Sequence, residues 1–147
     1  MKKIIIPPVF FIASILLISL IYFILPGLNY IIYPYNLSGI IVVIFGFIII
    51  GKARGLFAKY KTPHNFKLSI VLINEGIYGK TRNPMYVGFF VMLVGIVICF
   101  GNLLSFVVPL LFIFSINKIF IPFEENMMLD IFGDKYKEYT EKVKRWF

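Results

Sequence analysis

The stretch from Ile4 to Gly51 reads IIIPPVFFIASILLISLIYFILPGLNYIIYPYNLSGIIVVIFGFIIIG and contains no charged residue. A transmembrane helix needs about 20 apolar residues, and this stretch has roughly twice that length. It must therefore fold back on itself. Pro26-Gly27 and Pro34 mark the turn, and tyrosines gather around it, where amphipathic rings favour the membrane interface. The pattern predicts an N-terminal helical hairpin within residues 1–55.

A second charge-free stretch runs from Asn83 to Asn117 and is again too long for one helix. Gly101-Asn102 near its middle is a dipeptide typical of turns. We therefore predict a second hairpin, whose two short helices are each near the lower length limit for spanning. From Asn126 onward, apolar residues recur at helical spacing, which is typical of a short amphipathic helix lying on a membrane surface.

The composition also indicates a membrane protein. Of the 147 residues, 60% are hydrophobic, whereas soluble domains have about 45 to 50%. Fifteen Lys and Arg oppose seven Asp and Glu, and in a soluble protein this excess would suggest nucleic acid as a partner. Beside apolar spans, the anionic headgroups of membrane lipids are the expected partner, and no nucleic acid is expected.

The charges fall at the start of the sequence, in the loop between the hairpins and in the tail, whereas both hairpin turns are uncharged. Because Lys and Arg mark the cytoplasmic side, we expect a multi-pass protein of the cell membrane with both termini cytoplasmic. The start, Met1-Lys2-Lys3 before an apolar run, is similar to a signal peptide, but the run is long enough to span and no small-residue cleavage site follows. The sequence thus predicts an all-α integral membrane fold with about four transmembrane helices in two hairpins and an amphipathic C-terminal helix at the cytoplasmic face.

Two polar clusters lie at the ends of the predicted second hairpin. Polar groups at membrane depth are energetically costly, so they usually have a structural or functional role. The first is EGIYGKTRNPMYVG, residues 75–88, which leads into the third helix; the second is Glu124-Glu125, which follows the fourth helix and the helix-breaking Pro122. In a tight hairpin these two ends meet at one membrane face, so the clusters should be neighbours.

The chemistry of the two clusters is complementary. Pro84 suits the first turn of a helix, and the free amides behind it, with Arg82, would bind a carboxylate. Glu124 and Glu125 would face a cationic group. The residues themselves therefore predict a polar pocket for a zwitterion, or alternatively an ion pair that only fastens the hairpin.

The polar clusters carry a resemblance to a known family. The residues that carry it are Gly76-Ile77-Tyr78, Arg82-Asn83-Pro84-Met85-Tyr86-Val87-Gly88, Glu124-Glu125, and Phe132-Gly133 with Tyr136, Tyr139 and Val143. In order and spacing they resemble the isoprenylcysteine carboxyl methyltransferase family, including its prokaryotic members, and more distantly the phospholipid N-methyltransferases. The resemblance covers about half the chain, from Asn74 to Trp146.

This resemblance implies one membrane methyltransferase domain, 1–147, with residues 74–147 as its cofactor-binding half. It implies S-adenosylmethionine as cofactor and methyl transfer to a lipid-like or prenylated acceptor at the cytoplasmic face, by carboxyl O-methylation. Arg82 and Glu125 are expected to be catalytic. The expected cofactor-binding residues are Gly76, Tyr78, Arg82, Asn83, Pro84, Tyr86, Gly88, Glu124, Glu125 and Tyr136. Two alternatives stay open: a phospholipid amine N-methyltransferase, and a non-catalytic membrane scaffold or accessory subunit.

Three other features have simpler interpretations. His64 has no second histidine, and the single cysteine, Cys99, lies in an apolar run, so no metal site is expected. Gly39, Gly46 and Gly51 in the second helix are predicted to permit close packing of helices rather than to form a cofactor loop.

Overall fold

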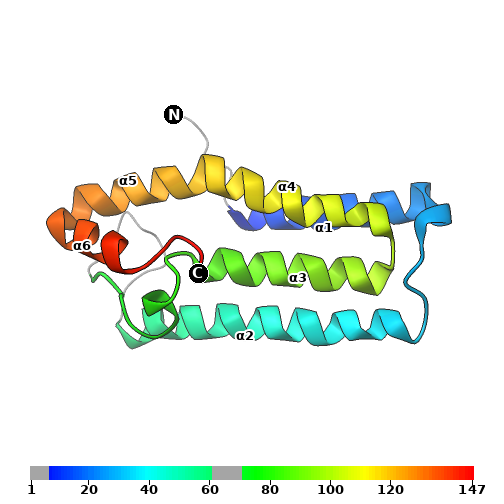
Figure 1. Ribbon diagram of the computed structural model, residues 1–147, viewed down its shortest axis with the longest axis horizontal. Helices are drawn as coiled ribbons and strands as arrows, with labels where there is room; N and C mark the ends of the chain where they lie inside the picture. Colours follow the sequence, from blue (N-terminus) through cyan, green and yellow to red (C-terminus); the bar gives the residue numbers. More distant parts are fainter. Residues whose placement is uncertain (1–6, 61–70) are drawn as a thin grey trace.

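The computed structural model describes residues 7–60 and 71–147, and within these ranges the regular structure is helical (Figure 1). His64 and part of the basic loop lie outside the described residues. The α-helices are α1 (Pro7–Ile24), α2 (Ser38–Lys59), α3 (Pro84–Phe100), α4 (Val107–Ser115), α5 (Ile121–Phe132) and α6 (Asp134–Lys142). Short 3-10 turns cover Pro26–Leu28, Tyr35–Leu37, Gly76–Gly79 and Leu103–Phe106, and a π-helical turn covers Ile116–Phe120.

Three helical stretches of the described chain are long and apolar enough to cross a membrane, namely Pro7–Ile24, Tyr35–Lys59 and Leu103–Phe132. The apolar α3 is shorter, with 17 residues. The predicted all-α membrane fold with about four apolar helices is therefore confirmed. The second helix continues past its predicted end at Gly51, because Ala53 and Phe57 extend its buried stripe while the charged residues Lys52 and Arg54 are exposed.

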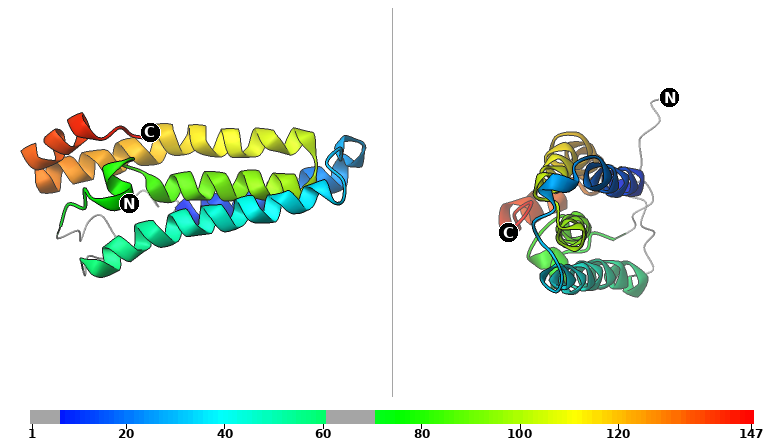
Figure 2. Two further views of the ribbon diagram at one scale, coloured as in Figure 1. Left: turned by 60° about the horizontal axis from the view of Figure 1, so that its bottom comes forward. Right: turned by 90° about the vertical axis from the view of Figure 1, so that its right-hand side faces the viewer.

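The central element of the bundle is α3. In Figures 1 and 2 it lies between α2 on one side and the layer of α1 and α4 on the other, and the contacts between these helices agree. The first two helices run antiparallel, as predicted, but each packs mainly against α3 or α4 rather than against the other. This arrangement places the start of α3 in the middle of one end of the bundle.

Glycines bring α2 and α3 close together. A Cβ atom built on Gly95 would lie 2.7 Å from the carbonyl oxygen of Gly39, and one on Gly88 would lie 3.0 Å from that of Gly46. Small residues allow this approach between helices in a membrane, where close van der Waals contact drives association. The packing role predicted for Gly39 and Gly46 is confirmed. For Gly51 the prediction is wrong, because a Cβ there would meet nothing within 4 Å.

The fourth helix does not end at Pro122, contrary to the prediction. The helical stretch Leu103–Phe132 passes through α4, the π-helical turn and α5 without a break, so Glu124 and Glu125 lie inside a helix (Figure 1). Proline lacks an amide hydrogen and its ring crowds the preceding turn of an α-helix. The wider π-helical turn Ile116–Phe120, directly before Pro122, accommodates this local mismatch.

Hydrogen bonds fasten the uncharged turns at the far end of the bundle. Gly101 adopts a left-handed φ of 77° and ends α3, which confirms the predicted turn. The fully buried Asn102 side chain donates to the carbonyl oxygen of Leu25 and to Asn29, and it accepts from two amides of its own turn. The two turns are thereby joined to each other.

The tail helix predicted from Asn126 onward is divided at Gly133: its first part is the end of α5 and its second part is the separate helix α6, whose apolar face is covered by protein. At Gly133, whose φ is 54°, the chain reverses after α5, so that α6 folds back alongside it (Figures 1 and 2). Tyr136, Tyr139 and Val143 are buried and cluster with Leu72, Met128 and Phe132. The tail therefore closes the polar end of the bundle.

Candidate active site

A pocket opens at the polar end, between the end of α2, the segment before α3, α5 and α6. It is lined by Phe57, Val71, Leu72, Ile73, Tyr78, Arg82, Asn83, Glu124, Glu125, Met128, Tyr136 and Tyr139. A second, more open hollow lies against Arg82 and Glu125 as well, and is bounded by Asn126, Leu129, Tyr136, Lys137 and Thr140. The two predicted polar clusters therefore meet in space, although about 40 residues separate them in the sequence.

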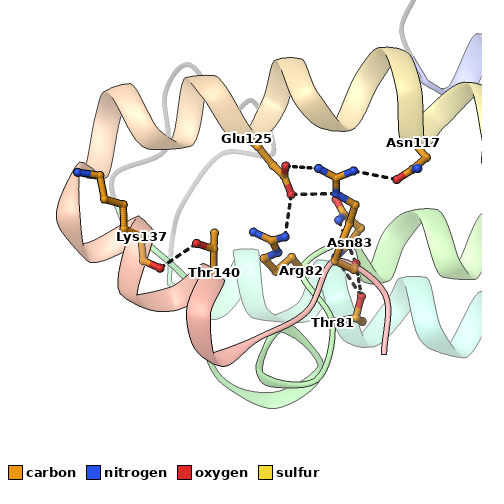
Figure 3. A network of polar contacts seen from close by, with 8 residues as sticks. Thr81, Arg82, Asn83, Asn117, Glu125, Lys137 and Thr140 are labelled. Carbon is orange, nitrogen blue, oxygen red and sulfur yellow. Dashed lines mark hydrogen bonds and ion pairs between the residues drawn. The ribbon is translucent and has the colours of Figure 1, made fainter.

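An ion-pair network forms the polar wall of the pocket (Figure 3). Glu125 accepts two hydrogen bonds from Arg145, from Nη2 to Oε2 at 2.6 Å and from Nε to Oε1 at 3.2 Å. Arg82 reaches the same carboxylate with Nη2 alone, at 3.2 Å from Oε1. Arg145 also donates from Nη1 to Asn117 at 3.0 Å, and Asn117 lies in the π-helical turn. One carboxylate thus serves two guanidinium groups.

The segment after α6 is fastened to the start of α3 by main-chain contacts. The amide of Arg82 donates to the carbonyl oxygen of Lys144 at 3.0 Å. The Thr81 hydroxyl and the Asn83 side-chain amide both donate to the carbonyl oxygen of Arg145, at 2.9 and 3.1 Å. Asn83 thus has a structural partner, and the tail holds the strip of chain that carries Arg82.

Some of the amides expected to bind a carboxylate are already used. The amide of Asn83 donates to the Thr81 hydroxyl, and that of Tyr86 donates to the carbonyl oxygen of Asn83. The helix start therefore offers less to an anion than the sequence suggested, since its first amides make local bonds. This leaves the guanidinium of Arg82 as the main anion-binding group at this position.

Arg82 has unused hydrogen-bonding capacity. Its side chain is 15% exposed, and its Nε atom is buried with no hydrogen-bond partner among the described residues. A buried donor without a partner is costly, and in a native structure it asks for an explanation such as a ligand. Arg82 is thus the group in this wall with a donor to spare.

The second glutamate has a different environment. Glu124 accepts a hydrogen bond of 2.6 Å from the Tyr86 hydroxyl, which reaches it from the first turn of α3. Short bonds from hydroxyl to carboxylate are among the stronger hydrogen bonds in proteins. This bond fixes one carboxylate oxygen of Glu124, and the residue still lines the pocket.

Tyrosines form much of the remaining wall. Burial raises the pKa of the Tyr136 hydroxyl to about 12; the nearby carboxylate of Glu125 adds to the rise and the guanidinium of Arg82 opposes it. Burial also raises the pKa of Tyr78 and Tyr139 above the ordinary value. These phenols therefore stay neutral at physiological pH, and Tyr139 donates to the carbonyl oxygen of Tyr78 at 2.7 Å.

The structure divides the predicted site residues into two groups. Those that line the pocket are Tyr78, Arg82, Asn83, Glu124, Glu125 and Tyr136. Gly76, Pro84, Tyr86 and Gly88 do not line it, although Tyr86 acts on it through Glu124. Gly88 instead faces Ile50 and Gly46 of α2, and Gly76, with φ of 59°, turns the chain beside Leu56. Both glycines are explained by packing and turn geometry.

Sequence reasoning missed Arg145, Thr81 and Asn117. The sequence held a weak indication that Arg145 belongs to the site. Arg145 stands beside Trp146 in the tail, and an arginine near the membrane is usually paired with a carboxylate. No local signal distinguishes Thr81 or Asn117, since each is recruited by a tail segment far away in the sequence. Among the described residues, no group of three His, Cys, Asp or Glu side chains could hold a metal ion.

Several curated proteins named as methyltransferases are similar to this chain. The protein-S-isoprenylcysteine O-methyltransferase of Schizosaccharomyces pombe is 41% identical over 76 residues, which are 50% of this chain and 31% of the relative. The Saccharomyces cerevisiae protein of the same name is 31% identical over 134 residues, 82% of this chain and 54% of the relative. Methanethiol S-methyltransferase 1 of Bradyrhizobium diazoefficiens is 34% identical over 89 residues, 60% of this chain and 28% of the relative.

The chain spans between about a third and about half of the length of these relatives. The sequence profile described as phospholipid methyltransferase matches residues 35–135, from the turn before α2 into α6. This region contains both polar clusters and the helices that bring them together. Because the profile matches most of its length, the chain belongs to the phospholipid methyltransferase family.

Proposed function

We propose that this chain transfers a methyl group from S-adenosylmethionine to a lipid-like or prenylated acceptor, by carboxyl O-methylation at the cytoplasmic face of the cell membrane. The observation that carries the proposal is Arg82, a largely buried guanidinium whose Nε atom has no partner in the described part of the chain, set beside two glutamates in a pocket walled by tyrosines. The names of the relatives support methyl transfer as the reaction class.

The residues of the pocket suit this cofactor, which carries a carboxylate, an ammonium and a sulfonium group. Arg82, which lines the pocket, would hold the carboxylate with its guanidinium group. Glu124 would face the ammonium, because Glu125 is already shared by two arginines while Glu124 has one phenol partner. Tyr78 and Tyr136 would offer ring faces to the adenine or the sulfonium, worth about 1 kcal/mol each for a cation. When bound, the cofactor supplies an electrophilic methyl group on sulfur.

The pocket residues would act mainly by positioning. A carboxylate acceptor is already ionised at neutral pH, so it needs no base, only alignment with the methyl group at about 3 to 3.5 Å. The ion-pair network on one side and the buried tyrosines on the other would orient the reactants and exclude water. In this reaction the acceptor oxygen forms a bond to the methyl carbon while the bond from that carbon to sulfur breaks.

The family description names phospholipids and so supports a second candidate, for which we propose an amine of a phospholipid headgroup as the acceptor. An amine must lose a proton before it attacks, and Glu124, which lines the pocket, would accept it. The two candidates therefore differ in whether Glu124 acts as a base.

The proposed orientation is supported by the charge distribution. The basic residues of α2, the segment before α3 and α6 gather at the pocket end, whereas the turns at the far end hold no charge. Under the positive-inside rule the pocket end would be cytoplasmic, and both termini with it.

Isothermal titration calorimetry of the detergent-purified protein tests the proposal, with S-adenosylmethionine and its demethylated product as ligands. Micromolar binding is expected, and Arg82→Ala should weaken it about tenfold to a hundredfold, the equivalent of one or two charge-assisted hydrogen bonds. Lys80→Ala is the matched control, because Lys80 is exposed, lies two residues away and does not line the pocket. Equal affinity of Arg82→Ala and the wild type would refute the proposed site. No binding by a folded wild type would favour the scaffold.

Transfer of a radiolabelled methyl group then identifies the acceptor. We expect label in a prenylcysteine analogue and its release as methanol in mild base, because esters hydrolyse there. Label that resists base and is found in phosphatidylethanolamine would instead establish the amine reaction.

A further inference from the structure

The two arginines that share Glu125 bind it differently. Arg145 makes two hydrogen bonds to the carboxylate, one to each oxygen, and its third nitrogen is held by Asn117. Arg82 makes a single contact to this carboxylate, 3.2 Å from its Nη2 atom to Oε1, and keeps a buried Nε atom with no partner among the described residues. Bidentate pairing is the stronger and more directional arrangement. Glu125 is therefore oriented by Arg145, and Arg82 is the weaker partner.

This asymmetry matters because the Glu125 carboxylate would otherwise take up the hydrogen-bond donors of the Arg82 guanidinium. If Glu125 turned to Arg82, the guanidinium would have a bidentate partner of its own and little capacity left for an anionic ligand. Arg145 prevents this by holding both oxygens of the carboxylate. The backbone of Arg145 has a separate task, since its carbonyl oxygen accepts from Thr81 and Asn83 and so fastens the tail.

We propose that Arg145 is a positioning residue, which captures Glu125 so that the guanidinium of Arg82 stays available to the anionic group of the ligand. For the identity of the ligand, this inference rests on the function proposed above. The capture itself is a property of the ligand-free protein and can be measured without any ligand.

The first test is an NMR spectrum of the Nε–H groups of the protein labelled with ¹⁵N-arginine, in detergent and without ligand. The chain has three arginines, Arg54, Arg82 and Arg145, so Arg→Gln variants assign all the signals. In Arg145→Gln, we expect the Arg82 signal to move downfield and to exchange more slowly with water, because Glu125 now accepts from it. The Arg54 signal should not move. An unmoved Arg82 signal would overturn the inference.

The second test measures binding of S-adenosylmethionine in a double-mutant cycle. The main-chain bonds at residue 145 remain in Arg145→Gln, so the variant removes only the guanidinium. We expect it to weaken binding about tenfold. Adding Glu125→Gln should restore part of the affinity lost in Arg145→Gln, because the freed carboxylate that captures Arg82 is gone. A merely structural role for Arg145 would leave the double variant at least as weak as Arg145→Gln, and that result would refute the inference.

The two tests separate this inference from the proposed function. If the wild type binds no cofactor but the Arg82 signal moves in Arg145→Gln, the positioning role stands and the proposed function falls. If the wild type binds S-adenosylmethionine but the Arg82 signal does not move in Arg145→Gln, the proposed function stands and the positioning role is refuted. Should Arg145→Gln fail to fold, Arg145→Lys replaces it: lysine keeps the charge but cannot pair bidentately, so a partial shift of the Arg82 signal is expected, and no shift would overturn the role.

Discussion

The packing of α2 on α3 gives a sharp prediction for Gly95→Ala. A Cβ atom at Gly95 would lie 2.7 Å from the carbonyl oxygen of Gly39, 2.7 Å from the amide nitrogen of Val43 and 2.8 Å from its Cγ2 atom. Two of these three atoms are backbone, so they cannot move aside alone. Reaching ordinary contact distances requires the helices to separate by about 0.7 Å, and overpacking of this kind costs about 1 to 3 kcal/mol.

Gly51→Ala is the matched control, since a Cβ there meets nothing within 4 Å. Both substitutions gain about 1 kcal/mol of helix propensity, so this gain cancels in the comparison. Gly95→Ala should therefore be less stable than Gly51→Ala by about 1 to 3 kcal/mol, or about 2 to 4 °C in Tm for each kcal/mol. Thermal unfolding in detergent, followed by circular dichroism at 222 nm, measures the difference. Equal Tm values for the two variants would refute close packing at Gly95.

Two further predictions concern buried hydrogen bonds. Tyr86→Phe removes the 2.6 Å hydrogen bond to Glu124 and should lower the free energy of unfolding by about 1.5 to 3 kcal/mol. The control Tyr30→Phe, at an exposed position, should change it by less than about 0.5 kcal/mol. Similar denaturation midpoints for the two variants would contradict the assigned hydrogen bond. Asn102→Ala removes the side chain that joins the two far turns and leaves their amides and carbonyls unpaired, so a loss of about 2 to 3 kcal/mol is expected, with exposed Asn126→Ala as control. Hydrogen exchange should rise at both far turns in Asn102→Ala, and unchanged protection there would count against this role.

Much of the fold could be predicted from local patterns. Spans such as Pro7–Ile24 were predictable because a helix that crosses a membrane needs a long, predominantly apolar run without charges, which is visible in the sequence itself. The turn at Gly101 after α3 and the uncharged character of both hairpin turns could likewise be read from short segments of the sequence. The end of α2 was missed because the first charges were taken as the boundary, whereas Lys52 and Arg54 sit on an exposed face of a helix that continues.

The candidate site was predictable in outline only. The meeting of Arg82 with Glu125 followed from hairpin connectivity, and the contact is present. The roles of Gly76 and Gly88 did not follow, because nothing in a sequence distinguishes a glycine that faces a ligand from one that faces a neighbouring helix. Pro122 was expected to end its helix, but the helix continues. The effect of a proline depends on whether the preceding turn can widen, and the sequence does not show this.

The sequence by itself determined that the chain is built of apolar helices, that its charges gather at one end, and that an arginine precedes one apolar stretch while two glutamates follow the next. These are properties of short segments and of their order along the chain. Only the tertiary structure decided that α3 lies at the centre, that Arg145 returns from the tail to hold Glu125, and that Arg82 keeps a donor to spare. Such outcomes depend on the distances among segments far apart in the chain, and those distances are set by packing and by competition among partners for one carboxylate.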